Sequence, residues 1–496
     1  MMSYEAIIGL EAHVELNTTS KMFCSCRVVD STTSEPNCYV CPVCAGMPGA
    51  LPSINERAVE IGILVSLALN CEIEEVSVFA RKNYFYPDLP KGYQISQYEK
   101  PLATNGYINI GDGHKASKIR IRRVHLEEDT GKLVHTNDSG KPRGISLIDL
   151  NRAGVPLLEI VSEPDIRSPL EAVNYAKELH SVLTYLDVNS GDMEKGVLRF
   201  EANVSVRLTG NKHLNTRREI KNLNSFKALQ RSIEYEIEQQ VTAYKSNQII
   251  LQETLGWDES NGKTIFQRSK EHSHDYRYFP EPDLPPLTIH DDWKNSILST
   301  MPQLPHTKRA HFLSLGLTNY DARVLASQRK IAEYFELAVK LGSDKNPPVL
   351  PKPIANWITT HLFSIINEAG KSIDQIDLPP THLVNLIDLV HSGRTNASSG
   401  KLVLREMCKT GDPPKIIVAQ LGLEQTNDQV TITKTVNQVL DNSPDQVTDL
   451  LDGKDSLFNW FFGQVMQAMD GKSNPDLVRT ALQDAIKKAS YNRGKE

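Results

Sequence analysis

The sequence predicts an α+β protein in which a mixed, largely antiparallel domain precedes all-helical domains. Up to about Trp293, short segments with alternating apolar and polar residues, typical of strands, are mixed with a few helices and many turns. From about Asp292 onward the apolar spacing is almost wholly helical. Because strands and helices occupy different parts of the chain, the pattern favours an α+β class.

Length and composition predict a globular protein of about three domains. The chain has 496 residues, of which 40% are hydrophobic and 23% charged. The change near Trp293 and a second change after Gly411-Asp412-Pro413-Pro414 set the predicted boundaries. We therefore expect domains at 1–292, 293–411 and 412–496.

The charge balance and the opening segment restrict location and partners. The formal net charge is -6, so any binding of RNA depends on local patches of Lys and Arg. The opening segment is acidic where a secretion signal needs a basic start. The apolar stretch Ala58 to Cys71 is short and carries Glu60, which indicates a packed helix. We expect a cytoplasmic protein.

The segment from Tyr4 to Leu16 reads as a strand with chemically different faces, because side chains alternate along a strand. One face is apolar, and the other carries Glu11, His13 and Glu15. Carboxylates this close repel each other, and a divalent cation relieves the repulsion. A charged outer face of a half-buried strand is the ordinary alternative.

Further segments bring more carboxylates and cations. Leu198 to Arg207 alternates in the same way, and its polar face carries Glu201 between the guanidinium groups of Arg199 and Arg207, which suit phosphate. The run from His125 to Asp129 and the pair Glu159 and Glu163 lie between these strands in the sequence. Alternation within each segment leaves open whether the faces converge.

Helix signals are clear at several places. Ser168-Pro169-Leu170-Glu171 has the pattern of a capping box with Pro at the first helical position, and a second helix begins near Asn224. In the C-terminal part, apolar periodicity predicts helices over Ala322 to Leu341, Pro353 to Glu368 and Pro380 to His391.

Five of the seven cysteines lie between Cys24 and Cys44, which in a large chain favours metal over disulfides. Two close pairs across a loop match a closed tetrahedral thiolate site for structural Zn²⁺. The favoured ligands are Cys24, Cys26, Cys41 and Cys44. Cys38 and Cys41 also have C-x-x-C spacing, and a set of free thiols is the alternative.

Several long motifs resemble one family. They are IGLEAHVEL near the start, RKNYFYPDLPKGYQISQYE from Arg81, HLEEDTGK from His125, IDLNRAGVPLLEIVSEPDI from Ile148, EIKNLNSF from Glu219, DYRYFPEPDLPPL from Asp275 and FGQVMQAMDGKSNPDLV near the end. Together they resemble, in order and over essentially the whole chain, the B subunits of tRNA-dependent amidotransferases. The chain departs from the family pattern at Cys38, at Phe200 and Glu201, and at Glu194-Lys195.

The resemblance implies an enzyme subunit with a cradle-like catalytic domain. Family members use ATP and Mg²⁺ to phosphorylate the side-chain carboxylate of misacylated Glu-tRNA(Gln) or Asp-tRNA(Asn). Ammonia from the A-type glutaminase subunit then gives Gln-tRNA(Gln) or Asn-tRNA(Asn), and a small C-type subunit completes a heterotrimer. The sequence itself lacks a Walker-type phosphate loop and a convincing amidase signature.

The resemblance also implies roles for particular residues. The catalytic, magnesium-binding set is Glu11, His13, Glu127, Glu159 and Glu201, and the candidates for phosphate contact in the ATP site are Lys82, Lys132, Arg199 and Arg207. The ring-rich run Tyr84-Phe85-Tyr86-Pro87 is a candidate lining of a nucleotide or acceptor-end pocket. The helical tail is expected to bind tRNA through lysines such as Lys472, Lys487 and Lys488.

Two other functions stay open at this point. One is a non-enzymatic, zinc-stabilised RNA-binding scaffold, which needs neither ATP nor a divalent cation at the carboxylates. The other is the archaeal E-type paralogue, although that relative carries an extra insertion and the motif order here is uninterrupted. The sequence leaves open which misacylated tRNA is the substrate.

Overall fold

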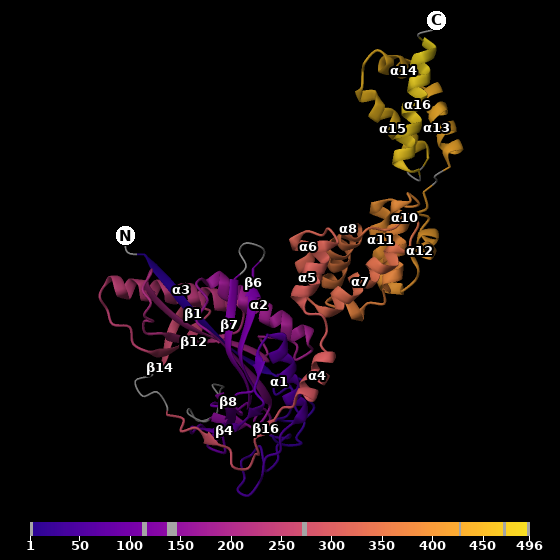
Figure 1. The fold of residues 1–496 in the computed structure, drawn as a ribbon. Coiled ribbons are helices and arrows are strands. Elements are labelled where there is room, and N and C mark those ends of the chain that lie inside the picture. Colours follow the sequence, from indigo (N-terminus) through magenta and orange to yellow (C-terminus); the bar gives the residue numbers. More distant parts are fainter. Residues whose placement is uncertain are drawn as a thin grey trace, which may run out of the picture. The chain divides into compact units, whose positions relative to one another are not determined.

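The computed structural model describes residues 3–111, 117–135, 146–269, 275–425, 428–469 and 473–493. The chain forms two compact units, Met1–Leu304 and Pro305–Glu496 (Figure 1). The first unit carries the strands and the second is helical, which confirms the predicted α+β class. The division into three domains at 292 and 411 stays a prediction.

A nine-stranded sheet organises the first unit, with the strand order β14-β13-β12-β11-β1-β10-β7-β6-β2. Its pairs are antiparallel except β12 with β13, and β1 is paired along both edges. The strands are β1 (Tyr4–Glu15), β2 (Glu72–Ile73), β6 (Ala103–Ile110), β7 (Ser117–Glu128), β10 (Pro156–Ser162), β11 (Leu198–Leu208), β12 (Arg218–Leu223), β13 (Glu253–Asp258) and β14 (Lys263–Ser269).

Three smaller sheets complete the strands of the described residues, in the orders β15-β4-β5, β16-β3 and β8-β9. Their strands are β3 (Val76–Ser77), β4 (Phe79–Asn83), β5 (Tyr93–Gln97), β8 (Lys132–His135), β9 (Ser146–Asp149), β15 (Phe279–Pro280) and β16 (Leu287–Thr288).

One face of the large sheet forms the core with the helices. α1 (Glu56–Ala68) packs on β7, α2 (Pro169–Tyr185) on β6 and α3 (Phe226–Lys245) on β11, while α4 (Asp291–Ser299) packs on α1. The predicted apolar faces of β1 and β11 are buried, which confirms the alternation. Their polar faces therefore lie on the opposite side of the sheet.

Side-chain caps start α2 and α3. The Ser168 hydroxyl accepts the backbone N–H of Glu171 at 3.2 Å, and the Ser225 hydroxyl accepts that of Ala228 at 3.0 Å. The reciprocal half of the predicted capping box is different, because the Glu171 carboxylate accepts the N–H of Arg167 at 2.8 Å instead of that of Ser168.

The second unit is built from helices. They are α5 (Pro305–Ser314), α6 (Asn319–Leu325), α7 (Arg329–Ser343), α8 (Pro351–Asn356), the π-helical turn η2 (Trp357–Leu362), α9 (Phe363–Ala369), the 3₁₀ turn η3 (Ile373–Gln375), α10 (Pro380–His391), α11 (Ala397–Thr410), α12 (Pro414–Gln420), α13 (Gln429–Asp441), α14 (Pro444–Leu451), α15 (Ser456–Ala468) and α16 (Pro475–Arg493).

Sequence periodicity predicted three helices of this unit by their ranges, and α8, η2 and α9 together cover the one predicted over Pro353 to Glu368. α10 has the predicted bounds, whereas the predicted helix over Ala322 to Leu341 is interrupted between α6 and α7. The last helices share a core of their own, formed by residues such as Val436, Phe461 and Val478. Within the described residues, every helix is too short or too polar to cross a membrane.

Candidate active site

A row of polar side chains crosses four strands of the large sheet. The register pairs His13 of β1 with Arg199 of β11 on one side and with Glu159 of β10 on the other, and Glu159 pairs in turn with His125 of β7. Directly opposed residues in an antiparallel sheet project from the same face. Non-local pairing thus gathers groups that lie far apart in the sequence.

The first cluster consists of His13 and Glu159 of this row together with Glu127 of β7, and their ligand atoms lie within 4.8 Å of one another. The Nε2 atom of His13 is 3.6 Å from Glu159 Oε2 and 3.8 Å from Glu127 Oε1. Glu127 also accepts the Ser96 hydroxyl at 3.3 Å. Two buried carboxylates and an imidazole form a donor set for a divalent cation.

The surroundings of Glu159 keep it ionised. Burial favours the neutral acid, but His125, whose Nε2 is 3.1 Å away, together with His13 and Lys82, holds the pKa of Glu159 well below its usual range. An ionised carboxylate in a partly desolvated site is a strong ligand for a hard cation.

The second cluster lies beside the first and consists of Glu11, Glu201 and Glu219, again within 4.8 Å of one another. β1 pairs Glu11 with Glu201, and β12 supplies Glu219. Burial, followed by the charges of Glu159 and Glu201, raises the pKa of Glu11. This all-oxygen set is of the kind that Mg²⁺ prefers.

Neighbouring donors hold the second cluster in place. Lys221 Nζ contacts both Glu201 oxygens at 2.7 and 2.8 Å and lies 3.8 Å from Glu219. The Asn203 side-chain amide donates to Glu11 at 2.9 Å, and the Thr254 hydroxyl donates to Glu219 at 2.7 Å. Without a metal ion, Lys221 supplies the positive charge that these acids require.

The structure therefore divides the five predicted magnesium ligands between two adjacent clusters. Sequence reasoning did not include Glu219 or Lys221 among the site residues. The signal that could have found them is the alternation in Glu219-Ile220-Lys221, where β12 carries its charged groups on either side of a buried Ile220.

Two of the four predicted phosphate contacts lie at this site. Burial opposes the charge on Lys82, but Glu127, Tyr278 and Glu159 outweigh that effect and raise the pKa of Lys82. Arg199 lies in the row itself, and its Nη2 donates to Asp129 at 2.9 Å. Both groups are fixed cations at neutral pH.

The other two predicted contacts lie elsewhere. Arg207 is at the far end of β11, where its Nε donates to Glu5 at 2.8 Å. Lys132 belongs to the separate two-stranded sheet formed by β8 and β9, opposite Asp149. Neither residue is brought to the carboxylate clusters by a contact among the described residues.

The ring-rich run divides in the same way. The Tyr84 hydroxyl donates to Gln94 at 3.1 Å, and its ring packs edge-on against Tyr276. Tyr276 lies under the Lys82 ammonium, which is 5.2 Å from the ring centre. Phe85, in contrast, is 90% exposed. Tyr84 therefore belongs to the wall of the site, whereas Phe85 faces solvent.

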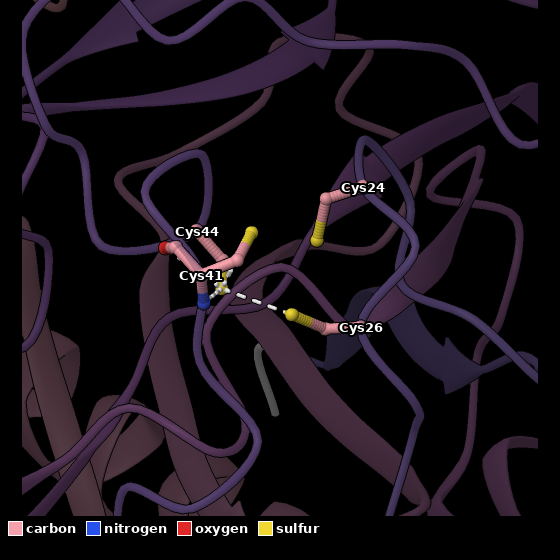
Figure 2. Close-up of side chains that lie close together, drawn as sticks. All are labelled: Cys24, Cys26, Cys41 and Cys44. Carbon is pink, nitrogen blue, oxygen red and sulfur yellow. Dashed lines mark hydrogen bonds between the residues drawn. The ribbon is translucent and has the colours of Figure 1, made fainter.

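The four favoured cysteines converge, as Figure 2 shows, with all sulfurs within 4.8 Å of one another. The Cys44 sulfur is 3.9 Å from that of Cys41 and 4.0 Å from that of Cys26. A tetrahedral zinc site with Zn–S bonds of about 2.3 Å places sulfurs about 3.8 Å apart. The spacing fits zinc, and the exposed Cys38 is outside the cluster.

Two family models match the chain, one over most of the first unit and one within the second unit. Residues 6–295 match the family model described as the GatB/GatE catalytic domain, and residues 333–486 match a GatB domain model.

Similar curated proteins include the aspartyl/glutamyl-tRNA(Asn/Gln) amidotransferase B subunits of Thermodesulfovibrio yellowstonii, 47% identical, and Persephonella marina, 48% identical. Each comparison covers 98% of this chain and the whole of the relative. The protein of the same name from Geotalea daltonii is 47% identical over 97% of this chain and 99% of its own length. This chain therefore belongs to the family of aspartyl/glutamyl-tRNA(Asn/Gln) amidotransferase B subunits.

Proposed function

We propose that this chain phosphorylates, with ATP, the side-chain carboxylate of Glu-tRNA(Gln) or Asp-tRNA(Asn) so that ammonia converts it to the amide. The observation that carries the proposal is the pair of carboxylate clusters lying side by side across β1. Adjacent divalent-cation sites suit an in-line phosphoryl transfer, where positioning and charge neutralisation dominate. The names of the relatives supply the substrate class.

The chemistry requires activation because a carboxylate is a poor acyl donor. A carboxylate oxygen attacks the γ-phosphorus of ATP, ADP leaves, and an acyl phosphate forms. Ammonia then attacks the carbonyl carbon and expels inorganic phosphate. Divalent cations, when bound, neutralise the phosphate oxygens and align the two reacting groups.

The chain's own residues then have distinct tasks. His13, Glu127 and Glu159 would hold one cation, and Glu11, Glu201 and Glu219 would hold the other. Lys82 and Arg199 offer fixed positive charge to the phosphate groups. Arg199 is oriented for this by Asp129, which in turn lies 3.6 Å from Arg152.

The thiolate site has a different task. Four cysteine ligands leave a zinc ion no open position, so the ion would be structural. Its chemical contribution is to fix the loops that carry the cysteines.

The partners follow from the same chemistry. The sequence lacks a convincing amidase signature. We therefore propose a heterotrimer in which the A-type glutaminase subunit supplies ammonia from glutamine and the C-type subunit completes the assembly. The tRNA would contact the tail helices, where Lys487 and Lys488 are exposed on α16. Lys472 lies outside the described residues.

The assembled heterotrimer provides the test. It is given ATP, Mg²⁺ and Glu-tRNA(Gln) or Asp-tRNA(Asn), with glutamine in one series and ammonium chloride in the other. We expect formation of ADP and amidated product in both series. We expect Glu11→Ala and His13→Ala each to abolish formation of ADP and of amidated product. The ammonium series separates this site from that of the glutaminase subunit.

Three outcomes would reject parts of the proposal. ATP-dependent amidation that survives both substitutions would remove the metal assignment, whereas absence of ATP-dependent amidation by the unaltered heterotrimer would favour the RNA-binding scaffold. Activity on Glu-tRNA(Gln) alone, with Asp-tRNA(Asn) bound but unchanged, would restrict the substrate class to the glutamyl form.

A further inference from the structure

A fully buried lysine lies beside the cysteine cluster. Lys21 has 0% exposure, and it precedes the buried Met22 and Phe23 in the segment that leads to Cys24. Lysine is almost never fully buried unless its charge is paired, because removing an ammonium from water is costly. Its surroundings therefore have to provide compensation.

The contacts of Lys21 use all three hydrogens of its ammonium. Nζ donates to the backbone carbonyl of Tyr39 at 2.9 Å, to that of Leu150 at 3.2 Å and to the Cys44 sulfur at 3.6 Å. Within the part of the chain that the structure describes, no carboxylate is paired with Lys21. The thiolate cluster is then the negative charge that faces the buried ammonium.

The charge of a zinc site explains why a cation belongs here. Four thiolates around one Zn²⁺ leave an excess of two negative charges in a partly buried environment. The backbone N–H of Cys41 donates to the Cys44 sulfur at 3.2 Å, but a backbone dipole does not neutralise a full negative charge. We propose that Lys21 is the buried counter-ion of the thiolate site and that it ties Cys44 to the segment leading into β10.

Other contacts join the segment around Lys21 to the segment that leads into β10. The Met22 N–H donates to the Gly154 carbonyl at 2.7 Å, and a Cβ at position 154 would lie 3.4 Å from the Cβ of Cys44. Gly154 has a φ of +85°, which favours glycine. The segment from Leu150 to Gly154 is thus held between Lys21 and the cysteine loop.

This segment leads directly to a cluster residue. β10 begins at Pro156, two residues beyond Gly154, and carries Glu159. The Asn151 side chain reinforces the link by accepting the Tyr39 N–H at 3.0 Å and donating to the Glu35 carbonyl at 2.8 Å. Lys21 is therefore a positioning residue, because its ammonium joins the Cys44 sulfur to the Leu150 carbonyl in the segment that leads into β10.

The experiment compares zinc affinity in the full-length chain, measured by competition with a chromophoric chelator. Lys21→Met keeps an unbranched side chain that is one atom shorter and removes the charge. We expect zinc affinity to fall about 10- to 100-fold, the usual effect of losing a group that supports a metal ligand. Lys21→Arg restores the charge and should recover most of the affinity, and the Co²⁺-substituted variant should show a shifted thiolate-to-metal absorption band.

Asn55→Ala is the matched control. The Asn55 amide donates to the carbonyls of Ser20 and Lys21, so its loss perturbs the same segment but leaves the ammonium in place. We expect lower thermal stability and unchanged zinc affinity. Equal zinc affinity of Lys21→Met and the unaltered chain would overturn the proposal.

If Lys21→Met does not fold, a second comparison tests whether the Lys21 charge compensates the thiolates. In a Cys44→Ser background the thiolate site is broken, and the buried ammonium has lost its counter-charge. Adding Lys21→Met should then stabilise the protein, whereas a purely packing role predicts further destabilisation. The inference rests on the proposed zinc site, and failure of that site is separately visible as absence of zinc from the unaltered chain.

Discussion

Glu159 lies between two imidazoles on neighbouring strands, and this position defines its chemistry. His13 and His125 approach the same carboxylate from β1 and β7, at 3.6 and 3.1 Å. Because these groups and Lys82 favour the ionised form, Glu159 stays a carboxylate despite its burial. A permanently charged oxygen ligand at this place is the property that the proposed cation site needs.

Glu159→Gln tests whether the site needs the charge of this carboxylate, because the substitution removes the charge and keeps the shape of the side chain. We expect ATP-dependent amidation by the heterotrimer to fall about 100-fold, in the range seen when one electrostatic contact to a transition state is lost. The Mg²⁺ concentration for half-maximal activity should rise. Steady-state rates over a Mg²⁺ titration measure both effects.

Glu163→Gln is the control for this substitution. Glu163 follows β10 closely but lies beyond its irregularity, and its carboxylate pairs with Arg122 at 2.9 Å. We expect unchanged rates and an unchanged Mg²⁺ requirement. A similar loss for both variants would mean that β10, rather than the Glu159 charge, accounts for the effect.

Lys221 holds the second cluster together when no cation is bound, because it contacts Glu201 and approaches Glu219. Lys221→Met leaves three carboxylates facing one another. We expect the free energy of unfolding to fall by about 1 to 2 kcal/mol in a chelating buffer, allowing for the partial exposure of the pair. Mg²⁺ should restore much of this loss, and thermal melts with and without Mg²⁺ provide the measurement.

The corresponding lysine in the helical unit provides the comparison. Lys308 contacts Glu336 at 2.6 Å, away from any cluster of carboxylates among the described residues. The stability lost in Lys308→Met should be the same with and without Mg²⁺. If Mg²⁺ rescued both variants equally, the ion would be acting on the whole protein and the second cluster would lose its assignment.

At the scale of elements, alternation within one strand was predictable, but the pairing between strands was not. Leu10 and Ala12 are buried and Glu11 and His13 share the other face, as the local pattern of β1 required. The row through Arg199, His13, Glu159 and His125 depends on the register of β10 with β7 and on those of β1 with β10 and β11, which lie more than a hundred residues from β1 in the sequence. Such registers leave little trace in the sequence of any one strand.

Two irregularities in strand pairing near the candidate site were not predicted from the sequence. The register shifts between Val161 and Ser162, where one step along β10 corresponds to two steps along β7, and Glu163 follows β10 directly after this point. A second shift lies between Phe200 and Ala202, next to the regular pairs that place Glu219 opposite Asn203 and close to Glu201. Because side chains alternate, a one-residue shift moves a residue to the other face of the sheet.

The packing of α1 on the sheet gives a prediction for an element. A Cβ at Gly62 would lie 2.7 Å from Leu102 Cδ2 and 3.3 Å from Leu126 Cδ2. Gly62→Ala should therefore push α1 away from the sheet and destabilise the first unit by about 1 to 3 kcal/mol, despite its better helix propensity. Chemical denaturation measures the change.

Gly463→Ala is the matched substitution in a helix without such contacts, because nothing lies within 4 Å of a Cβ at that position of α15. Helix propensity then acts alone, and we expect a gain of up to about 1 kcal/mol. Opposite signs for the two substitutions would confirm that packing decides the outcome at Gly62. A gain at both positions would contradict the packing argument.

At the scale of the whole molecule, the chain consists of units with independent cores. The core of the first unit joins the large sheet to α1, α2 and α3, and the last four helices have a core of their own in the second unit. The cysteine cluster belongs entirely to the first unit. A substitution at the cysteines should therefore change the stability of the first unit only.

Removal of zinc tests this division. Metal binding that requires a folded site contributes directly to the stability of the fold around it. We expect about one zinc per chain in elemental analysis. Treatment with a strong chelator should lower the calorimetric transition of the first unit and leave that of the helical unit in place.

Two cysteine substitutions connect the calorimetry to particular atoms. Cys41→Ser removes a sulfur 3.9 Å from Cys44, and it should lose zinc and reproduce the shift caused by the chelator. Cys38→Ser alters an exposed thiol outside the cluster and should change neither zinc content nor either transition. If Cys41→Ser kept its zinc, or if chelation lowered both transitions equally, the ion would not be confined to these four thiolates. With the expected result, zinc stabilises the cysteine loops, which contact the segment that leads into β10. Because the carboxylate clusters lie in the same unit, zinc then also supports their positions.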